Sequence, residues 1–168
     1  MTSHTEPGSD FMRQALVQAA LVVDRVYPYP GVGVVLVHGS HVIARANNGE
    51  PGQPHAEVKA ISMAQKDGWP LSECVLFTNL EPCDNVGLQQ ACSRTIIDSG
   101  IKEVHVAVRD PYHLVRGQGI ARLQEAGVGV VYGEYEEQAR WQNHRYFRRF
   151  CPKCGWPIAD GKDEYHRE

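Results

Sequence analysis

The sequence predicts an α/β fold, a three-layer α/β/α sandwich built around a mixed five-stranded sheet. Two short apolar runs, residues 32–37 and 42–46, are separated by a tight turn and predict an antiparallel hairpin. Two later runs, residues 103–108 and 128–132, flank a helical pattern, and this order of strand, helix and strand implies parallel pairing with a right-handed crossover. A chain of 168 residues is long enough to bury such a sheet between helices in one domain.

The first half of the chain supplies the elements that lead to a candidate site. Residues 1–9 are polar and are expected to form a flexible N-terminal tail, so the domain is predicted to cover residues 10–150. From Asp10 onwards, apolar residues recur on one helical face, which predicts a core helix. After the hairpin, the loop of residues 47–54 is rich in proline and glycine and leads into a second helix at residues 55–66.

The second half is expected to alternate strands with helices. A short apolar run predicts a third strand at residues 73–78, and a helix of residues 89–99 follows, closed by Gly100. Residues 117–126 are predicted to form the helix between the last two strands, and residues 134–150 the last helix. Together with the hairpin, these elements complete the mixed sheet between two layers of helices.

The predicted last helix interleaves arginines with aromatic residues. These residues are Arg140, Trp141, Arg145, Tyr146, Phe147, Arg148 and Arg149. Such a mixture can bind single-stranded nucleic acid by stacking and charge. The alternative is an amphipathic helix whose aromatic side chains pack inward while the arginines stay solvated, and the acidity of the whole chain favours it.

The composition is that of an ordinary globular domain, with 42% hydrophobic and 22% charged residues. The net charge of −3 and the pI near 6.2 argue against a nucleic-acid partner and favour a small molecule. Five cysteines are an odd number, which argues against a disulfide framework. We find neither a secretory signal pattern nor an apolar run near the ~20 residues that span a bilayer, so a cytoplasmic protein with no membrane partner is expected.

Three residues form a candidate metal site, namely His55, Cys83 and Cys92. Zn²⁺ typically takes three protein ligands of these types, plus a water, when it works as a catalyst. Glu57 belongs to the same first helical turn as His55, so its carboxylate is expected beside that water without binding the metal. Zinc lowers the pKa of a bound water to about 7, and Glu57 would take the released proton.

This combination of residues is typical of hydrolytic zinc deaminases, in which a glutamate that is not a ligand serves as general acid and base. The alternative is a structural zinc site with a glutamate nearby on the surface. Structural sites normally close with a fourth protein ligand, and neither of the two motifs offers one. The catalytic interpretation is therefore preferred.

On these motifs, the chain resembles the deaminase domain of the riboflavin-biosynthesis pyrimidine deaminase/reductase, within the cytidine deaminase-like superfamily. Eight residues separate Cys83 from Cys92, as in the riboflavin deaminases, whereas nucleic-acid and deoxycytidylate deaminases usually have two. The resemblance extends over about residues 11–150. The resemblance also rests on residues 28–37 (PYPGVGVVLV), residues 110–130 (DPYHLVRGQGIARLQEAGVGV), Gln142, Asn143 and Phe147. It implies a cytidine deaminase-like fold, one catalytic Zn²⁺, a homo-oligomer (dimer or tetramer) and no nicotinamide site.

The chain departs from the family at several positions that are candidates for binding the substrate. Tyr29 stands where the family usually has asparagine, Asn48 where it has histidine, and Tyr112 where it has asparagine. Asn85 replaces a histidine and Leu88 a basic residue, and the loss of this cation removes a candidate phosphate contact. The added tyrosines offer flat apolar faces for stacking a ring. The pocket is therefore predicted to be altered, although Arg116 is a candidate to replace the missing cation.

The resemblance and the motifs together predict hydrolytic deamination of an amino-substituted, pyrimidine-like heterocycle, with release of ammonia. By analogy with related deaminases, main-chain groups around Ala56 and Pro82 would orient the ring. One alternative is the riboflavin-pathway diaminopyrimidine phosphate deaminase itself. Another, of a different class, is a zinc-stabilised binding or scaffold protein without catalysis.

Residues 151–168 are expected to form a C-terminal tail with a Cys-x-x-Cys pair, Cys151 and Cys154. Such a pair is half of a zinc ribbon, but no second pair follows. The two thiolates could hold a second, structural zinc completed by His144, by His166 or by a partner subunit. Alternatively, they are a plain reducible pair.

Overall fold

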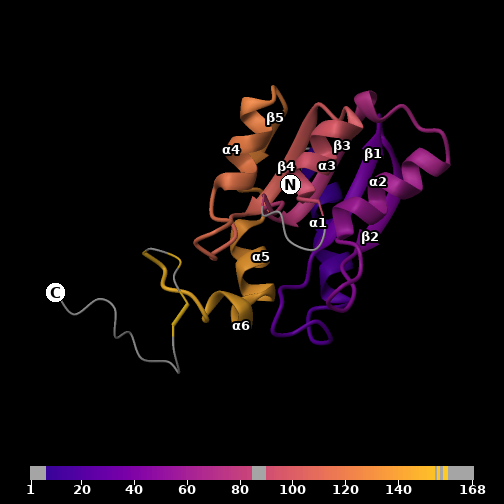
Figure 1. Ribbon diagram of the computed structural model, residues 1–168. Coiled ribbons are helices and arrows are strands. Elements are labelled where there is room, and N and C mark those ends of the chain that lie inside the picture. The colour runs from indigo at the N-terminus through magenta and orange to yellow at the C-terminus, as the bar shows by residue number, and fades with distance from the viewer. Residues whose placement is uncertain (1–6, 85–89, 154, 156, 159–168) are drawn as a thin grey trace, which may run out of the picture.

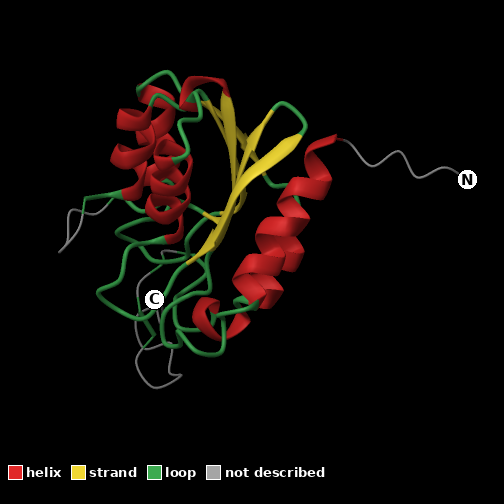
Figure 2. Ribbon diagram, turned by 90° about the vertical axis from the view of Figure 1, so that its right-hand side faces the viewer, coloured by secondary structure: helices red, strands yellow, loops and turns green. Residues whose placement is uncertain are grey.

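The protein is described from a computed structural model that covers residues 7–84, 90–153, 155 and 157–158. A five-stranded sheet lies between two layers of helices, which is plain when the sheet is seen nearly edge-on (Figure 2). The predicted three-layer α/β/α sandwich is confirmed. Within the described residues, no helix has the length and apolar character needed to cross a bilayer.

The sheet has the strand order β2-β1-β3-β4-β5 (Figure 1). Its strands are β1 (Gly33–His38), β2 (His41–Asn47), β3 (Cys74–Leu80), β4 (Glu103–Val108) and β5 (Gly129–Tyr132). Strand β1 pairs antiparallel with both β2 and β3, whereas β3, β4 and β5 run parallel. The mixed sheet and the hairpin agree with the prediction, and each strand lies within two residues of its predicted bounds.

Helices cover both faces of this sheet. They are α1 (Pro7–Ala20), α2 (Ala56–Lys66), the 3-10 helix η1 (Leu71–Glu73), α3 (Cys92–Ser99), α4 (Gln118–Glu125), α5 (Glu136–Gln142) and α6 (His144–Phe147). Helices α2, α3 and α4 share one core with the sheet, and α1 and α5 share the other. Both layers therefore exclude water from the centre of the sheet.

Strand β1 shows why the chain needs both layers. Val34 and Leu36 face the core of α2 to α4, while Val35 and Val37 face the core of α1, and all four are at most 2% exposed. Burying one such side chain contributes roughly 1.5–3 kcal/mol. A Cβ on Gly33 would collide with the carbonyl oxygen of Ala15, so this glycine lets α1 lie directly on the sheet.

Three predicted helices differ from the structure in their extent. Helix α1 begins at Pro7, three residues before its predicted start at Asp10, and residues 1–6 lie outside the described residues. The single last helix predicted at residues 134–150 is wrong, because the chain forms two short helices, α5 and α6, on either side of Asn143. The 89–99 helix is observed as α3 from Cys92, and Gln89 lies outside the described residues.

A tertiary hydrogen-bond pair explains the break in the last helix. The buried amide of Asn143 accepts the N–H of Gly31 at 2.8 Å and donates to the carbonyl of Gly31 at 2.9 Å. Both polar groups of Gly31, immediately before β1, are thus satisfied by one side chain from the far end of the domain. This contact ties the C-terminal helices to the entry of the sheet.

We expect Asn143→Ala to lower the free energy of unfolding by roughly 2–4 kcal/mol, because it leaves the buried N–H of Gly31 without this acceptor. Urea denaturation followed by circular dichroism measures the effect. Gln138→Ala, an exposed position on α5, is the matched control and should change stability little. Equal stability of the two variants would contradict this role of Asn143.

Candidate metal centre and the network behind it

The structure brings the three predicted ligands together from three separate elements. His55 directly precedes α2, Cys83 follows β3, and Cys92 opens α3. Their ligand atoms all lie within 4.8 Å of one another, with His55 Nδ1 3.1 Å from Cys92 Sγ and 3.6 Å from Cys83 Sγ. Tetrahedral zinc with ordinary Zn–N and Zn–S bonds would separate such atoms by about 3.5–3.8 Å. The donor set and its spacing therefore fit zinc.

Backbone contacts hold the two cysteines together despite their long separation in the sequence. Ser93 donates its N–H to the carbonyl of Cys83 at 3.1 Å, and Cys92 donates its own to Cys83 Sγ at 3.4 Å. The Ser93 hydroxyl also donates to Asp84 at 2.6 Å. These hydrogen bonds hold the two ends of the segment together. Cys83 and Cys92 therefore lie close to each other although eight residues separate them in the sequence.

The two thiols differ in their protonation. Hydrogen bonds from Cys92 and from His55 lower the pKa of Cys83 to about 4, so Cys83 is a thiolate at neutral pH. The neighbouring Cys83 thiolate, together with burial, raises the pKa of Cys92 well above its usual value. The hydrogen bond to Cys83 also raises the pKa of His55. One thiolate is therefore ready to bind a cation, and the other would lose its proton when a cation binds.

Glu57 lies beside the ligands in the first turn of α2. It is 3% exposed, and its Oε2 accepts a hydrogen bond from the Cys92 thiol at 3.4 Å. Burial, reinforced by the charge of Cys83, raises the pKa of Glu57. A carboxyl whose pKa is moved toward neutrality can both accept and return a proton, as general acid–base catalysis requires.

Sequence reasoning assigned no role to Glu81, yet its buried carboxylate organises the surroundings of the metal centre. It accepts the N–H groups of Asp110 at 3.2 Å, Gly117 at 2.9 Å and Ile120 at 3.2 Å. A Cβ on Gly119 would collide with the carbonyl oxygen of Pro82, so α4 starts in direct contact with the segment that carries Cys83. The sequence signals that could have found this contact are the Glu-Pro-Cys triplet and the Gly-x-Gly at residues 117–119.

A second buried carboxyl extends this network. Oδ1 of Asp110 accepts the N–H of Tyr112 at 2.8 Å and the hydroxyl of Tyr146 at 2.9 Å. Burial raises the pKa of Asp110 to about 7, because desolvation outweighs the two hydrogen bonds that favour the charged form. Asp110 and Glu81 therefore join the end of β4 to the loop before Cys83.

The candidate substrate residues fall at different places. Tyr29 is exposed, Tyr112 is half-buried, and Ala56 and Pro82 are buried beside His55 and Cys83. The amide of Asn48 accepts the N–H of Val32 at 2.7 Å and donates to the carbonyl of Pro30 at 2.9 Å. Asn85 lies outside the described residues, as do Leu88 and Cys154. Substrate contacts by these residues stay predictions.

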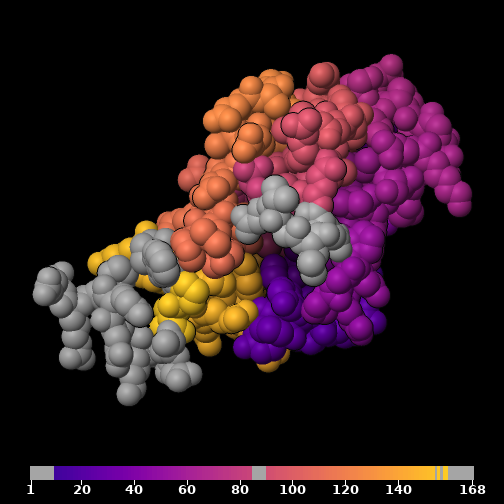
Figure 3. All heavy atoms as spheres, in the orientation of Figure 1, coloured from indigo at the N-terminus to yellow at the C-terminus, as the bar shows by residue number. Residues whose placement is uncertain are grey.

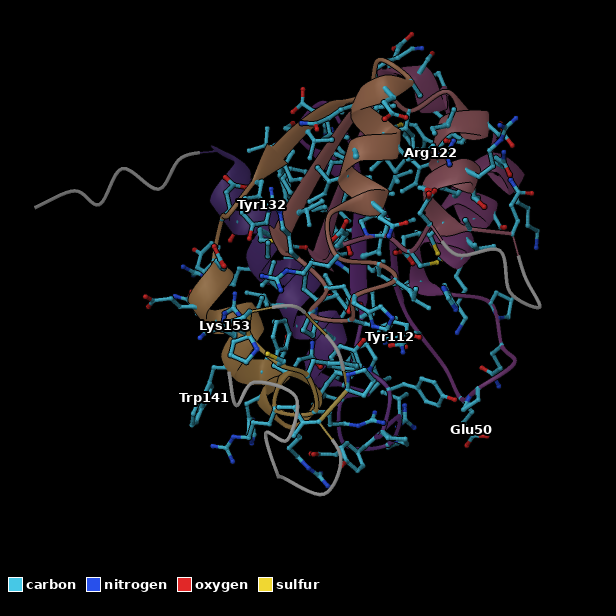
Figure 4. The ribbon with its side chains drawn as sticks, turned by 60° about the vertical axis from the view of Figure 1, so that its left-hand side comes forward. Glu50, Tyr112, Arg122, Tyr132, Trp141 and Lys153 are labelled. Carbon is cyan, nitrogen blue, oxygen red and sulfur yellow. The ribbon has the colours of Figure 1, made fainter. Side chains whose placement is uncertain are left out.

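In the view of Figure 4, Tyr112 falls between Arg122 of α4 and Glu50. The guanidinium of Arg122 pairs with Asp84 at 3.4 Å. Arg116, the candidate replacement for the missing phosphate contact, donates to the carbonyls of Pro152 at 3.2 Å and Lys153 at 3.1 Å. The guanidinium groups of Arg116 and Arg122 are therefore both bonded to protein oxygens.

Among the described residues, only His55, Cys83 and Cys92 form a group of three or more potential metal ligands. Cys151 is buried, and its carbonyl accepts the N–H of Gly155 at 2.8 Å. Gly155 has φ 77°, a left-handed conformation that turns the chain back after the Cys-x-x-Cys pair.

Comparison with known proteins agrees with the site. Residues 5–108 match the family described as the cytidine and deoxycytidylate deaminase zinc-binding region. The chain is similar to the riboflavin biosynthesis protein RibD of Synechocystis, with 36% identity over 135 residues, and to that of Aquifex aeolicus, with 37% identity over 142 residues. These matches cover 80% and 84% of this chain but 36% and 39% of the relatives, so the chain spans less than half of their length.

Solved structures of deaminases are also similar to this chain. A diaminohydroxyphosphoribosylaminopyrimidine deaminase/5-amino-6-(5-phosphoribosylamino)uracil reductase from Thermotoga maritima is similar with a TM-score of 0.80 and 36% identity. The match covers 83% of this chain and 40% of that one. A dCMP deaminase from cyanophage S-TIM5 has a TM-score of 0.61 at 22% identity over 76% of this chain and 98% of its own, and this likeness shows the fold alone.

The pKa of Asp110 gives a prediction about stability. The folded protein holds the Asp110 proton up to about pH 7 and the unfolded chain only up to about pH 4, so the folded state binds it more tightly. The stabilisation from this proton is complete below about pH 4 and is lost as the pH rises to about 7. In Asp110→Asn, we expect the decline of the free energy of unfolding over this range to be smaller, by on the order of 4 kcal/mol.

Urea unfolding of the two proteins at several pH values between 4 and 8 measures this difference. Asp98→Asn, which removes an exposed carboxylate paired with Arg94 at 2.9 Å, is the control and should keep the wild-type slope. A wild-type slope in Asp110→Asn would show that Asp110 is charged throughout this range.

Proposed function

The chain belongs to the family of cytidine and deoxycytidylate deaminases, and from this premise we propose that it hydrolyses an amino-substituted, pyrimidine-like heterocycle to the carbonyl compound and ammonia. The observation that carries the proposal is the meeting of His55, Cys83 and Cys92 beside the buried carboxyl of Glu57. Three protein ligands leave a fourth position for water, as catalytic zinc sites require.

The proposed reaction needs one proton carrier. Zinc held by the three ligands would supply a water of lowered pKa. Glu57 would take a proton from the attacking water and deliver it to the ring nitrogen of the C=N bond under attack. Glu57 would then carry the remaining proton of the added hydroxyl to the amino group, which leaves as ammonia as its C–N bond breaks and the C–O bond becomes C=O. The buried position of Glu57, which raises its pKa, supports both transfers.

Two kinds of heterocycle are candidates for the substrate. The likeness to riboflavin-pathway proteins supports a diaminopyrimidine phosphate as one candidate substrate. A changed pocket is supported by Tyr29, Asn48 and Tyr112, which replace the residues usual in that family, and by the commitment of Arg116 to backbone carbonyls. We favour an altered substrate that depends less on a phosphate contact. A homo-oligomer stays a prediction from the resemblance, and a cytoplasmic location stays a prediction from the sequence pattern.

Glu57→Gln should retain zinc, and its rate of ammonia release should fall by roughly 10²- to 10⁴-fold. The amide keeps the shape of the side chain but cannot carry the proton. The assay measures ammonia release by the zinc-loaded protein from a panel of aminopyrimidines that includes the phosphorylated riboflavin intermediate. Glu50→Gln, an exposed position in the preceding loop, is the control and should keep activity.

Each outcome of this assay separates the candidate functions. Release from the phosphorylated intermediate favours the riboflavin-pathway enzyme, and release from another compound favours the altered pocket. Stoichiometric zinc with no release from any compound would favour the zinc-stabilised scaffold protein over the enzyme.

A second, structural zinc on Cys151 and Cys154 is also proposed. The burial of Cys151 and the left-handed turn at Gly155 support it, since a Cys-x-x-Cys knuckle needs the chain to reverse at this point. We expect two zinc ions per chain by atomic emission, and one in Cys151→Ser. Cys74→Ser, a buried cysteine of β3, is the control and should retain two. A wild-type content of one ion would contradict the second site.

A further inference from the structure

The loop after β4, residues 109–117, is held from two sides. On the side of the metal centre, Glu81 accepts the N–H groups of Asp110 and Gly117. The loop also contacts α6 and the described residues within 148–158, which we call the C-terminal segment. The loop carries Tyr112, a candidate substrate residue, between these two anchors.

Backbone and ring contacts join the loop to the C-terminal segment. Arg116 donates to the carbonyls of Pro152 and Lys153, and His113 donates its N–H to the carbonyl of Gly155 at 3.0 Å. The ring of Phe150 lies 5.5 Å from that of Tyr112. Figure 3 shows the yellow C-terminal segment directly against the orange loop and the indigo residues that precede β1.

Tyr146 provides a buried polar contact between α6 and this loop. Its hydroxyl donates to Oδ1 of Asp110, the same oxygen that accepts the N–H of Tyr112. Asp110 is 7% exposed and Tyr146 is 8% exposed, so water is a poor substitute for either partner. One carboxylate oxygen therefore couples the position of Tyr112 to that of α6.

The metal ligands are held by other contacts. The N–H groups of Cys92 and Ser93 close the Cys83 loop, and α2 places His55 and Glu57. A change at Tyr146 therefore reaches the loop of Tyr112 while these contacts persist. The aromatic ring of Tyr112, half-buried, offers a flat surface against which a heterocycle can stack.

We propose that Tyr146 is a positioning residue for substrate binding, which acts through Asp110 to fix Tyr112 as a wall of the heterocycle site. This inference rests on the proposed function. It assigns a role in specificity to the C-terminal helices, which supply neither a residue of the His55, Cys83 and Cys92 group nor the proton carrier.

Tyr146→Phe tests this role, because it keeps the packing of the ring on Phe150 and removes only the hydroxyl. We expect KM to rise roughly five- to tenfold while kcat changes less than about twofold and zinc content stays constant. Amide hydrogen exchange in residues 109–117 should become faster. Tyr135→Phe, which removes a hydroxyl bonded to Arg13 at the half-buried residue before α5, is the matched control and should change none of these quantities.

A second variant separates positioning from a general loss of structure. Tyr112→Ala should raise KM by itself, and Tyr146→Phe should add little in that background, because the residue that it positions is gone. An equal further rise in KM in the double variant would overturn the inference, as would a Tyr146→Phe effect on kcat alone. Unchanged exchange at residues 109–117 in Tyr146→Phe would overturn it whatever the activity.

The same measurements keep this inference apart from the proposed function. Ammonia release by the wild type that Glu57→Gln abolishes supports the deaminase, even where Tyr146→Phe behaves as the wild type. In that case the positioning role alone fails.

Discussion

The buried carboxylate of Glu81 is the contact on which the site depends. Glu81 lies between the end of β3 and Cys83, so its position also fixes the path of the chain from the strand to Cys83. By accepting N–H groups from the loop after β4 and from the start of α4, it satisfies donors that a helix start and a sharp loop leave unpaired. The ligand loop, α4 and the Tyr112 loop therefore share one anchor.

This anchor belongs to a cluster of buried acids. Burial raises the pKa of Glu57, Glu81 and Asp110, and the Cys83 thiolate adds to the effect on Glu57 and Asp110. A buried excess of negative charge is costly unless a cation compensates it. Bound zinc would supply that charge at the thiolates, so the binding of metal and the stability of the site are coupled.

The fold was predictable where pattern and local chemistry agree. Short apolar runs identified all five strands, and the hairpin followed from the short turn between β1 and β2. The last helix was mispredicted because its helical pattern is continuous across Asn143, whereas the side chain of Asn143 is committed to Gly31. Local propensity carries no information about such a partner more than a hundred residues away.

The sequence by itself determined the candidate metal ligands and the candidate proton carrier, because residue type and spacing indicate their chemistry directly. The residue types alone identify the candidates His55, Glu57, Cys83 and Cys92. Nitrogen and sulfur donors with a carboxylate close by in the sequence are typical of a catalytic zinc site. Only the tertiary structure decided what supports them. The roles of Glu81, of Asp110 with Tyr146, and of Asn143 rest on hydrogen bonds between segments distant in the chain, and burial, which a sequence does not display, gives these bonds their strength.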